Sequence, residues 1–149
     1  MLVDTVLKRR SYDVAVLPPT ATTAEAAQLL CQQHIQIVVI CGPGRQIIGV
    51  VTDSDILRAV GRCAGDSGAC RRDLLGLMTR DVVTCRPGDT LDRVVSMMLQ
   101  RGLRRIPVVG TDGALAGLIT MREALLYLYE QAKLDGELLR EYFLGIGYH

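Results

Sequence analysis

The sequence has few aromatic residues and almost no net charge. It contains no tryptophan and one phenylalanine, and its formal net charge at pH 7 is +1 over 149 residues. A balanced charge supplies no general basic surface for nucleic acid, and the arginines are not interleaved with aromatic residues as single-strand binding requires. No run of about twenty apolar residues is present, which excludes an ordinary membrane span. We therefore expect a globular protein without nucleic-acid or membrane partners.

Motifs for catalysis and metal binding are also missing. No Gly-x-Ser-x-Gly, His-Glu-x-x-His or Gly-x-x-x-x-Gly-Lys spacing occurs, and His34 and His149 are the only histidines. We expect no enzyme activity, no catalytic residue, no metal site and no required cofactor. Five cysteines without a Cys-x-x-Cys spacing leave at least one thiol unpaired, which favours a reducing cytoplasm. Cys63 and Cys70, in a glycine-rich connector, leave a redox or metal-binding role open.

What the sequence does contain is an internal repeat with an offset of 68 residues. Residues 49–52 and 117–120 both run from glycine through two apolar residues to threonine, and a carboxylate follows three residues later, at Asp55 and Glu123. The offset holds without a gap over the surrounding segments. Further matched pairs are Val14 with Val82, Pro19 with Pro87, Gly42 with Gly110 and Leu57 with Leu125. The chain is therefore an internal duplication.

Each copy is expected to fold in the order strand, helix, strand, strand, helix, which is an α+β architecture. The capping-box spacing Thr22-x-x-Glu25 predicts a helix that ends near His34, and glycine-containing turns predict a hairpin in each copy. We expect strands at 14–17, 35–41 and 47–52 in the first copy and at 82–84, 103–109 and 115–120 in the second. Helices are expected at 2–10, after residues 22, 55, 90 and 122, and as a short piece at 73–78.

The chain is expected to divide at a glycine-rich break over residues 61–68. We assign 1–68 to the first copy with an N-terminal helix, 69–130 to the second copy with its linker helix, and 131–149 to a helical tail. The tail carries an apolar stripe, which typically covers either the protein's own core or a second subunit. We favour contact between the subunits of a homodimer. The stripe comprises Leu134, Leu138, Leu139 and Tyr142.

Two interpretations apply to the polar cluster at the end of the strand that finishes with Thr52. Thr52, Asp53 or Ser54 caps the helix that follows. Alternatively, the hydroxyls of Thr52 and Ser54 bind phosphate or sugar oxygens, and Asp55 accepts hydrogen bonds from a vicinal diol. The repetition of the pattern in the second copy favours the ligand interpretation.

With the duplication established, the sequence resembles a tandem pair of cystathionine-beta-synthase-type (CBS) domains, a regulatory module also called a Bateman module. The resemblance spans residues 3–130 and rests on the two Gly-h-h-Thr-x-x-acid segments, the linker 77–84 and the segment 104–109. It implies two copies related by a pseudo-twofold axis, as in small stand-alone bacterial CBS-pair proteins. Two clefts between the copies would hold adenosine-containing ligands such as AMP, ADP, ATP, NAD or S-adenosylmethionine.

The resemblance implies one cleft with a complete set of binding groups. Asp55 would take the ribose hydroxyls, and the backbone of Val82 and Val83 would meet the adenine edge. Thr52, Arg104 and Arg105 would hold phosphate. The expected nucleotide-binding residues are Val50, Thr52, Ser54, Asp55, Val82, Val83, Arg104, Arg105 and Pro107.

The second cleft is expected to bind more weakly. Glu123 stands in the position of Asp55, and Gln36 with Ile37 replaces the two arginines, so that a phosphate finds fewer charge-assisted hydrogen bonds. Arg122 leaves open a positive charge from another direction. The residues expected here are Val14, Ala15, Gln36, Ile37, Val39, Leu118, Thr120, Arg122 and Glu123.

The leading hypothesis is thus a regulatory module that senses a nucleotide of the AMP, ADP or ATP class and is not an enzyme. The alternative is a non-catalytic dimeric interaction or structural protein with vestigial clefts. Retention of Asp55 and both arginines of the first cleft favours the sensor. A sensor implies a regulated partner protein, which no motif in the chain identifies.

Overall fold

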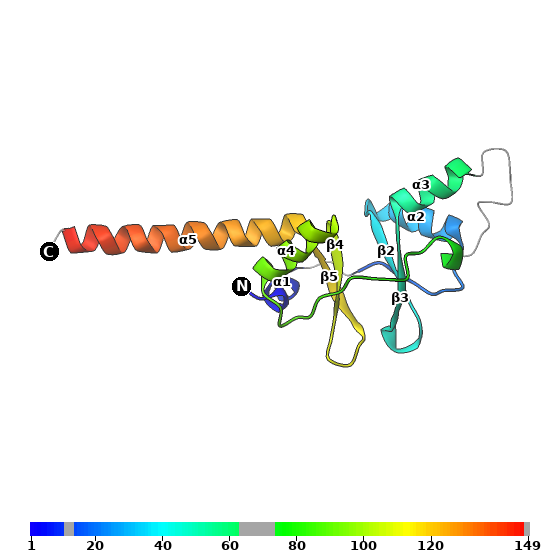
Figure 1. Cartoon of the computed structure of the whole chain (residues 1–149), viewed down its shortest axis with the longest axis horizontal. Coiled ribbons are helices and arrows are strands. Elements are labelled where there is room, and N and C mark those ends of the chain that lie inside the picture. Colours follow the sequence, from blue (N-terminus) through cyan, green and yellow to red (C-terminus); the bar gives the residue numbers. More distant parts are fainter. Residues whose placement is uncertain (11–13, 63–73, 148–149) are drawn as a thin grey trace.

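The computed structural model describes residues 1–10, 14–62 and 74–147, and its two halves repeat one arrangement (Figure 1). The first half contains β1 (Val16–Leu17), α2 (Thr23–Gln33), β2 (Ile37–Cys41), β3 (Ile47–Thr52) and α3 (Asp53–Arg62). The second half contains α4 (Leu91–Arg101), β4 (Arg105–Val109), β5 (Leu115–Thr120) and α5 (Met121–Gly147). Helix α1 (Val3–Arg9) precedes the first half, and a 3₁₀ turn at Leu74–Gly76 precedes the second.

The two hairpins share one register, which confirms the duplication. Ile37 lies opposite Thr52 in the first hairpin, and Arg105 lies opposite Thr120 in the second. Both hairpins shift register at matching points, before Cys41 and before Val109. The helix ends match as well: Thr22 and Thr90 cap α2 and α4, which both end at a left-handed residue, His34 or Gly102. Gly102 suits that conformation because glycine has no Cβ.

The strand expected at residues 82–84 is absent. Cys85 instead makes a single parallel bridge to Val108, matching the pair of Leu17 with Ile40 in the first half. Thr79 is held on the other hairpin, where its N–H and C=O both pair with Val50 at 2.9 and 3.0 Å. The five residues between Thr79 and Cys85 therefore cross from one hairpin to the other and cannot run along either one.

Each half is completed by the segment that precedes the other half. Helix α1 starts the chain, yet its Val3 and Val6 are fully buried in the core of the second half, with α4 and both strands of the second hairpin. Conversely, Leu74 of the 3₁₀ turn is fully buried in the core of the first half with Val38 and Ile40. The two halves are interlocked, so neither has a complete core of its own.

A pseudo-twofold axis relates the halves. Gln46 forms an isolated antiparallel bridge with Ala114, and these two residues are equivalents under the 68-residue offset. A residue meets its own equivalent only near a symmetry axis. A third, small cluster of buried residues joins the two sheets there, made of Val39, Cys41 and Leu115.

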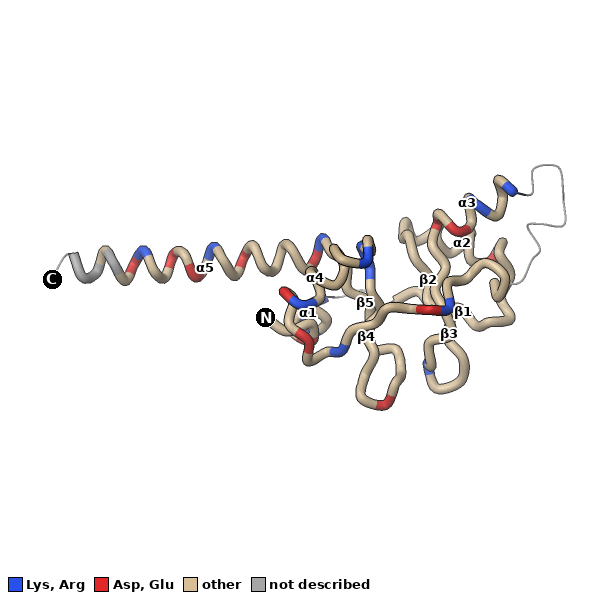
Figure 2. The backbone as a smooth tube through the Cα atoms, viewed as in Figure 1, with Lys and Arg blue, Asp and Glu red and all other residues tan. Residues whose placement is uncertain are grey.

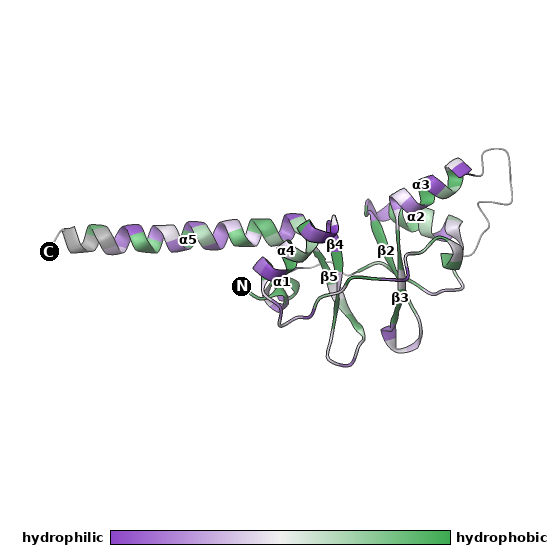
Figure 3. Ribbon diagram, viewed as in Figure 1, coloured by the Kyte–Doolittle hydropathy of each residue, from purple (hydrophilic) through white to green (hydrophobic). Residues whose placement is uncertain are grey.

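Helix α5 has 27 residues and extends far beyond the paired halves (Figure 1). It begins in the second core, where Ala124 is fully buried, and crosses residue 130 without a break. From Ala132 onward, every side chain whose burial is described is exposed, and apolar residues recur along the helix (Figure 3). Neither α5 nor any other helix within the described ranges is long and apolar enough to cross a membrane.

The glycines that begin the two repeated segments allow a close approach that a side chain would obstruct. A Cβ at Gly49 would lie 2.7 Å from the sulfur of Met78 and 2.8 Å from the carbonyl oxygen of Thr79. A Cβ at Gly117 would lie 2.7 Å from a terminal methyl group of Leu7. A leucine methyl can rotate away, whereas the Thr79 carbonyl is fixed by its pairing with Val50.

We therefore expect Gly49→Ala to lower the free energy of unfolding by about 1–3 kcal/mol, the usual cost of overpacking. Gly117→Ala should lower the free energy of unfolding by distinctly less. Urea unfolding of both variants and the wild type, followed by circular dichroism, measures the difference. Equal losses, or a larger loss at Gly117, would contradict this account of the two contacts.

Candidate functional site

The turn at Thr52 is a reciprocal helix cap. The backbone N–H of Thr52 donates to Asp55 Oδ2 at 2.9 Å, and the N–H of Asp55 donates to Thr52 Oγ1 at 3.2 Å. Thr120 and Glu123 repeat the arrangement at 3.4 and 3.1 Å. The capping interpretation is therefore confirmed in both copies. The pairing also fixes both carboxylates at the strand-to-helix turn.

Capping leaves Asp55 able to accept further hydrogen bonds. Its other oxygen, Oδ1, lies 2.8 Å from Nη2 of Arg58, and 11% of the Asp55 side chain is exposed. A carboxylate has about four lone-pair sites, so each oxygen keeps one for a ligand. Sequence reasoning missed Arg58, although its position three residues after Asp55 on a helix is the spacing of an ion pair.

The first cleft is a hollow of about 350 Å³ that brings together eight of the nine residues expected there. Strand β3, the crossing segment 79–83 and the start of the second hairpin all contribute to it. Ser54 does not line it: its side chain is exposed, and its N–H donates to Asp53 Oδ1 at 2.8 Å. The expected residues that line it are Val50, Thr52, Asp55, Val82, Val83, Arg104, Arg105 and Pro107. Ile37, which was expected in the second cleft, also lines it, together with residues that sequence reasoning assigned to neither cleft: Arg58, Thr79, Asp81, Gly102 and Leu103.

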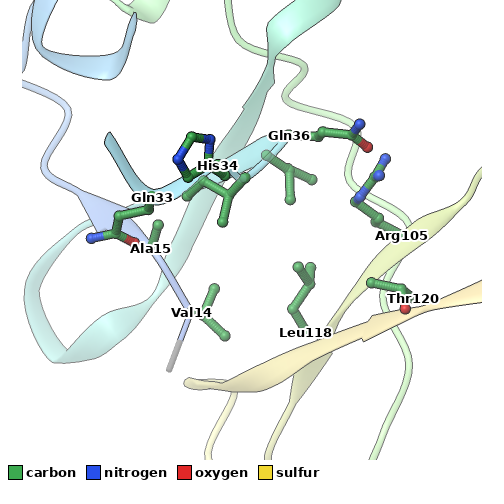
Figure 4. Close-up of a pocket in the computed structure, with 10 residues that line it drawn as sticks. Val14, Ala15, Gln33, His34, Gln36, Arg105, Leu118 and Thr120 are labelled. Atoms are coloured by element: carbon green, nitrogen blue, oxygen red, sulfur yellow. The ribbon is translucent and has the colours of Figure 1, made fainter. Parts of the chain in front are cut away.

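The second cleft is larger, about 500 Å³, and among its described lining residues Arg105 is the only arginine, lysine or carboxylate (Figure 4). Val14 and Leu118 lie on one side, and Gln36 and Arg105 lie together at one end. Three residues expected here, Val39, Arg122 and Glu123, do not line the hollow. The lining residues are Val14, Ala15, Gln33, His34, Ile35, Gln36, Ile37, Arg105, Leu118 and Thr120.

The carboxylate of the second copy is engaged by an arginine of the N-terminal segment. Nη2 of Arg10, directly after α1, lies 2.8 Å from Glu123 Oε2, and only 8% and 19% of these side chains are exposed. The residue that matches Arg10 in the other half is Met78, which has no charge. The two clefts thus differ in the availability of their carboxylate, and the repeat pattern gave no signal of this difference.

The two buried cysteines of the described core, Cys41 and Cys85, are poorly suited to react as thiolates. Burial raises the pKa of Cys41, and burial together with the charge of Asp89 raises the pKa of Cys85 to about 12, so both stay protonated at neutral pH. Cys63 and Cys70 lie outside the described residues. Within the described ranges, no three His, Cys, Asp or Glu side chains gather as a metal site would require.

Two interlocked copies with two clefts between them define a tandem-repeat module. A family model described as CBS domain matches this chain twice, over residues 6–62 and 72–130. The matches cover more than half of the chain, which therefore belongs to the CBS-domain family. CBS pairs are typically regulatory and non-catalytic modules. The chain spans 57%, 64% and 21% of the first three curated relatives that it matches, at 26–30% identity.

Solved structures share the fold over most of the chain. A CBS-domain containing protein from Agrobacterium tumefaciens is 28% identical, with a TM-score of 0.72, and the match covers 85% of this chain and 97% of that chain. The CBS domain pair of protein MJ0100, in complex with 5′-methylthioadenosine and S-adenosyl-L-methionine, is 22% identical (TM-score 0.73, coverage 87% and 99%). CBSX2 in complex with AMP is 20% identical (TM-score 0.72, coverage 88% and 98%). At these last two identities the likeness establishes the fold.

The two acid–arginine pairs are expected to differ in their effect on stability. Arg10→Met removes the partner of a largely buried carboxylate, so the free energy of unfolding should fall by about 3 kcal/mol. Arg58 is 65% exposed, and Arg58→Met should cost at most about 1 kcal/mol. Urea unfolding at pH 7 measures both.

The double variant Arg10→Met/Glu123→Gln serves as the control. It should regain part of the loss, because it also removes the unpaired charge. If Arg10→Met and Arg58→Met lower the free energy of unfolding equally, or if the double variant regains none of that energy, the pair of Arg10 with Glu123 does not stabilise the fold as described.

Proposed function

We propose that this protein is a regulatory module that binds an adenine nucleotide in the first cleft. The observation that carries the proposal is the convergence of a carboxylate, a hydroxyl and two arginines on one hollow. Asp55 and Thr52 come from the first copy, and Arg104 and Arg105 come from the second. The hollow has the volume of a small-molecule site, roughly 300–1,000 Å³.

The proposed roles follow from the chemistry of these groups. Asp55, with one free lone pair on each oxygen, accepts from the two ribose hydroxyls. Val82 and Val83 lie in the crossing segment and have no strand partner among the described residues, so their backbone groups are available to the edge of adenine. Arg104 and Arg105 give charge-assisted hydrogen bonds to phosphate, about twice as strong as neutral ones.

The ligands of related structures support an adenosine-containing ligand. Two CBS pairs of the same fold were solved with AMP or with 5′-methylthioadenosine and S-adenosyl-L-methionine. The two arginines of this chain favour a ligand with a terminal phosphate, which carries more negative charge than each phosphate of the internal pyrophosphate of NAD, so AMP, ADP and ATP rank before NAD and S-adenosylmethionine. The second cleft offers no free carboxylate for ribose and has one arginine, so it is the weaker site.

Binding in the first cleft would change the angle between the two halves. Its lining comes from both copies, so a ligand contacts them simultaneously. It shifts the angle between the copies only as far as it binds one arrangement more tightly than another. We infer that this shift is transmitted to a partner protein in the cytoplasm. A reducing compartment is consistent with the free thiols of Cys31, Cys41 and Cys85.

Isothermal titration with AMP, ADP, ATP, NAD and S-adenosylmethionine tests the proposal. Asp55→Asn keeps an oxygen for the helix cap but removes the charge, and it should raise the dissociation constant about tenfold or more. Asp53→Asn is the matched control: the same change, two residues away, on a side chain that does not line the cleft. It should leave affinity unchanged.

The same ligand should stabilise the wild type by about 2.7 kcal/mol at a hundred times its dissociation constant. Absence of binding by all five ligands would reject the nucleotide proposal and favour the interaction protein with vestigial clefts. Equal affinities of Asp55→Asn and the wild type would reject the first cleft as the site.

We further propose that α5 forms a homodimer contact. Its Leu134, Leu138 and Leu139 are 55–58% exposed, in a helical segment where every side chain whose burial is described is exposed. Isolated helices of about this length are marginal in water, so a partner surface is needed to hold the segment helical. The apolar stripe suits the same stripe of a second copy.

Sedimentation equilibrium is expected to show a dimer for the wild type and a monomer for the double variant Leu134→Glu/Leu138→Glu. The variant D135N/E137Q changes polar positions of the same segment and should stay dimeric. A monomeric wild type, or a dimeric Leu134→Glu/Leu138→Glu variant, would show that the stripe does not hold two copies together.

A further inference from the structure

A neighbouring hollow shares two lining arginines with the first cleft. This hollow of about 720 Å³, here called the arginine basin, is bordered by Arg104 and Arg105 and by Arg122 at the start of α5. Figure 2 shows basic residues close together where α4 is followed by β4. The remaining lining residues are Gln36, Thr120, Met121, Leu125, Leu126 and Tyr129.

The basin is positively charged, and none of the described residues that line it is acidic. Within the described part of the chain, no carboxylate lies within salt-bridge distance of Arg104, Arg105 or Arg122, whereas Arg10, Arg58 and Arg93 are each paired. Three arginines at one hollow repel each other unless an anion lies between them. Gln36 and Tyr129 add neutral donors at the same border.

The position of the basin relates it to the phosphate end of a ligand in the first cleft. Asp55 lines the cleft and not the basin, whereas Arg104 and Arg105 line both. A nucleotide with its ribose at Asp55 and its first phosphate at these arginines would direct further phosphates into the basin. Arg122 lines the basin but not the first cleft.

We propose that the cleft and the basin form one site for a nucleoside polyphosphate, and that Arg122 discriminates di- and triphosphates from the monophosphate. This inference rests on the proposed function and specifies its ligand. The second cleft also borders the basin, through Gln36, Arg105 and Thr120. It is not the source of the phosphates, because its carboxylate Glu123 is engaged by Arg10 and does not line it.

Titration of AMP, ADP and ATP into the wild type, Arg122→Gln and Arg101→Gln at one fixed ionic strength tests the inference. Arg101 is exposed in the last turn of α4 and lines neither hollow. Arg101→Gln is therefore the matched control, because it removes one positive charge, as Arg122→Gln does, without changing either lining. The wild type should bind ATP at least about tenfold more tightly than AMP. Arg122→Gln should reduce that ratio to about one or two without weakening AMP, and Arg101→Gln should preserve it.

The outcomes separate this inference from the proposed function. If AMP binds through Asp55 but ATP binds no more tightly, or if the ratio survives in Arg122→Gln, the basin is an ordinary solvated cluster and the inference fails alone. If Arg101→Gln lowers the ratio as much as Arg122→Gln, general charge and not contact explains it, and the inference also fails. If none of the three nucleotides binds the wild type, the proposed function fails first.

Discussion

The structure depends on the exchange of core segments between its two halves. Val3 and Val6 of α1 complete the second core, and Leu74 completes the first, so that folding of either half requires the other. The crossing segment is fixed at both ends, by the pairing of Thr79 with Val50 and of Cys85 with Val108. This exchange holds the halves at a defined separation, and clefts lined by both copies follow from it.

The same exchange makes the two clefts chemically different. An internal duplication repeats the backbone register, the helix caps and the hairpin turns, yet the segments that precede the halves have diverged. Arg10 reaches Glu123 in one half, whereas its counterpart in the other half is Met78. Among the described residues, Asp55 therefore pairs only with the exposed Arg58, and it still lines the first cleft. One carboxylate serves the stability of the fold, and the other is available to a ligand.

Local patterns in the sequence were sufficient for the repeat, the hairpins and the caps, because these features depend on residues close together in the chain. Thr22-x-x-Glu25 forms the expected capping box, and eight of nine residues expected in the first cleft line it. The two largest failures involve distant segments. The strand at 82–84 is lost because the segment must span two hairpins, and the pairing of Arg10 with Glu123 joins residues 113 positions apart. The periodicity of a sequence gives no information about contacts between residues so far apart in the chain.

Arg122 shows why a motif position alone does not assign a residue to a site. By the repeat offset it matches Ser54, and neither residue lines the cleft of its own copy. Both follow a capping threonine by two positions, on a helix face that points away from the cleft. Around Ser54 no such pair of arginines gathers, because in its own copy Gln36 and Ile37 replace Arg104 and Arg105. Around Arg122 those two arginines border the same hollow. A position that is a solvent-facing serine in one copy thus becomes the third member of a cationic cluster in the other. The asymmetry that leaves the second cleft poor in charge concentrates that charge beside the first.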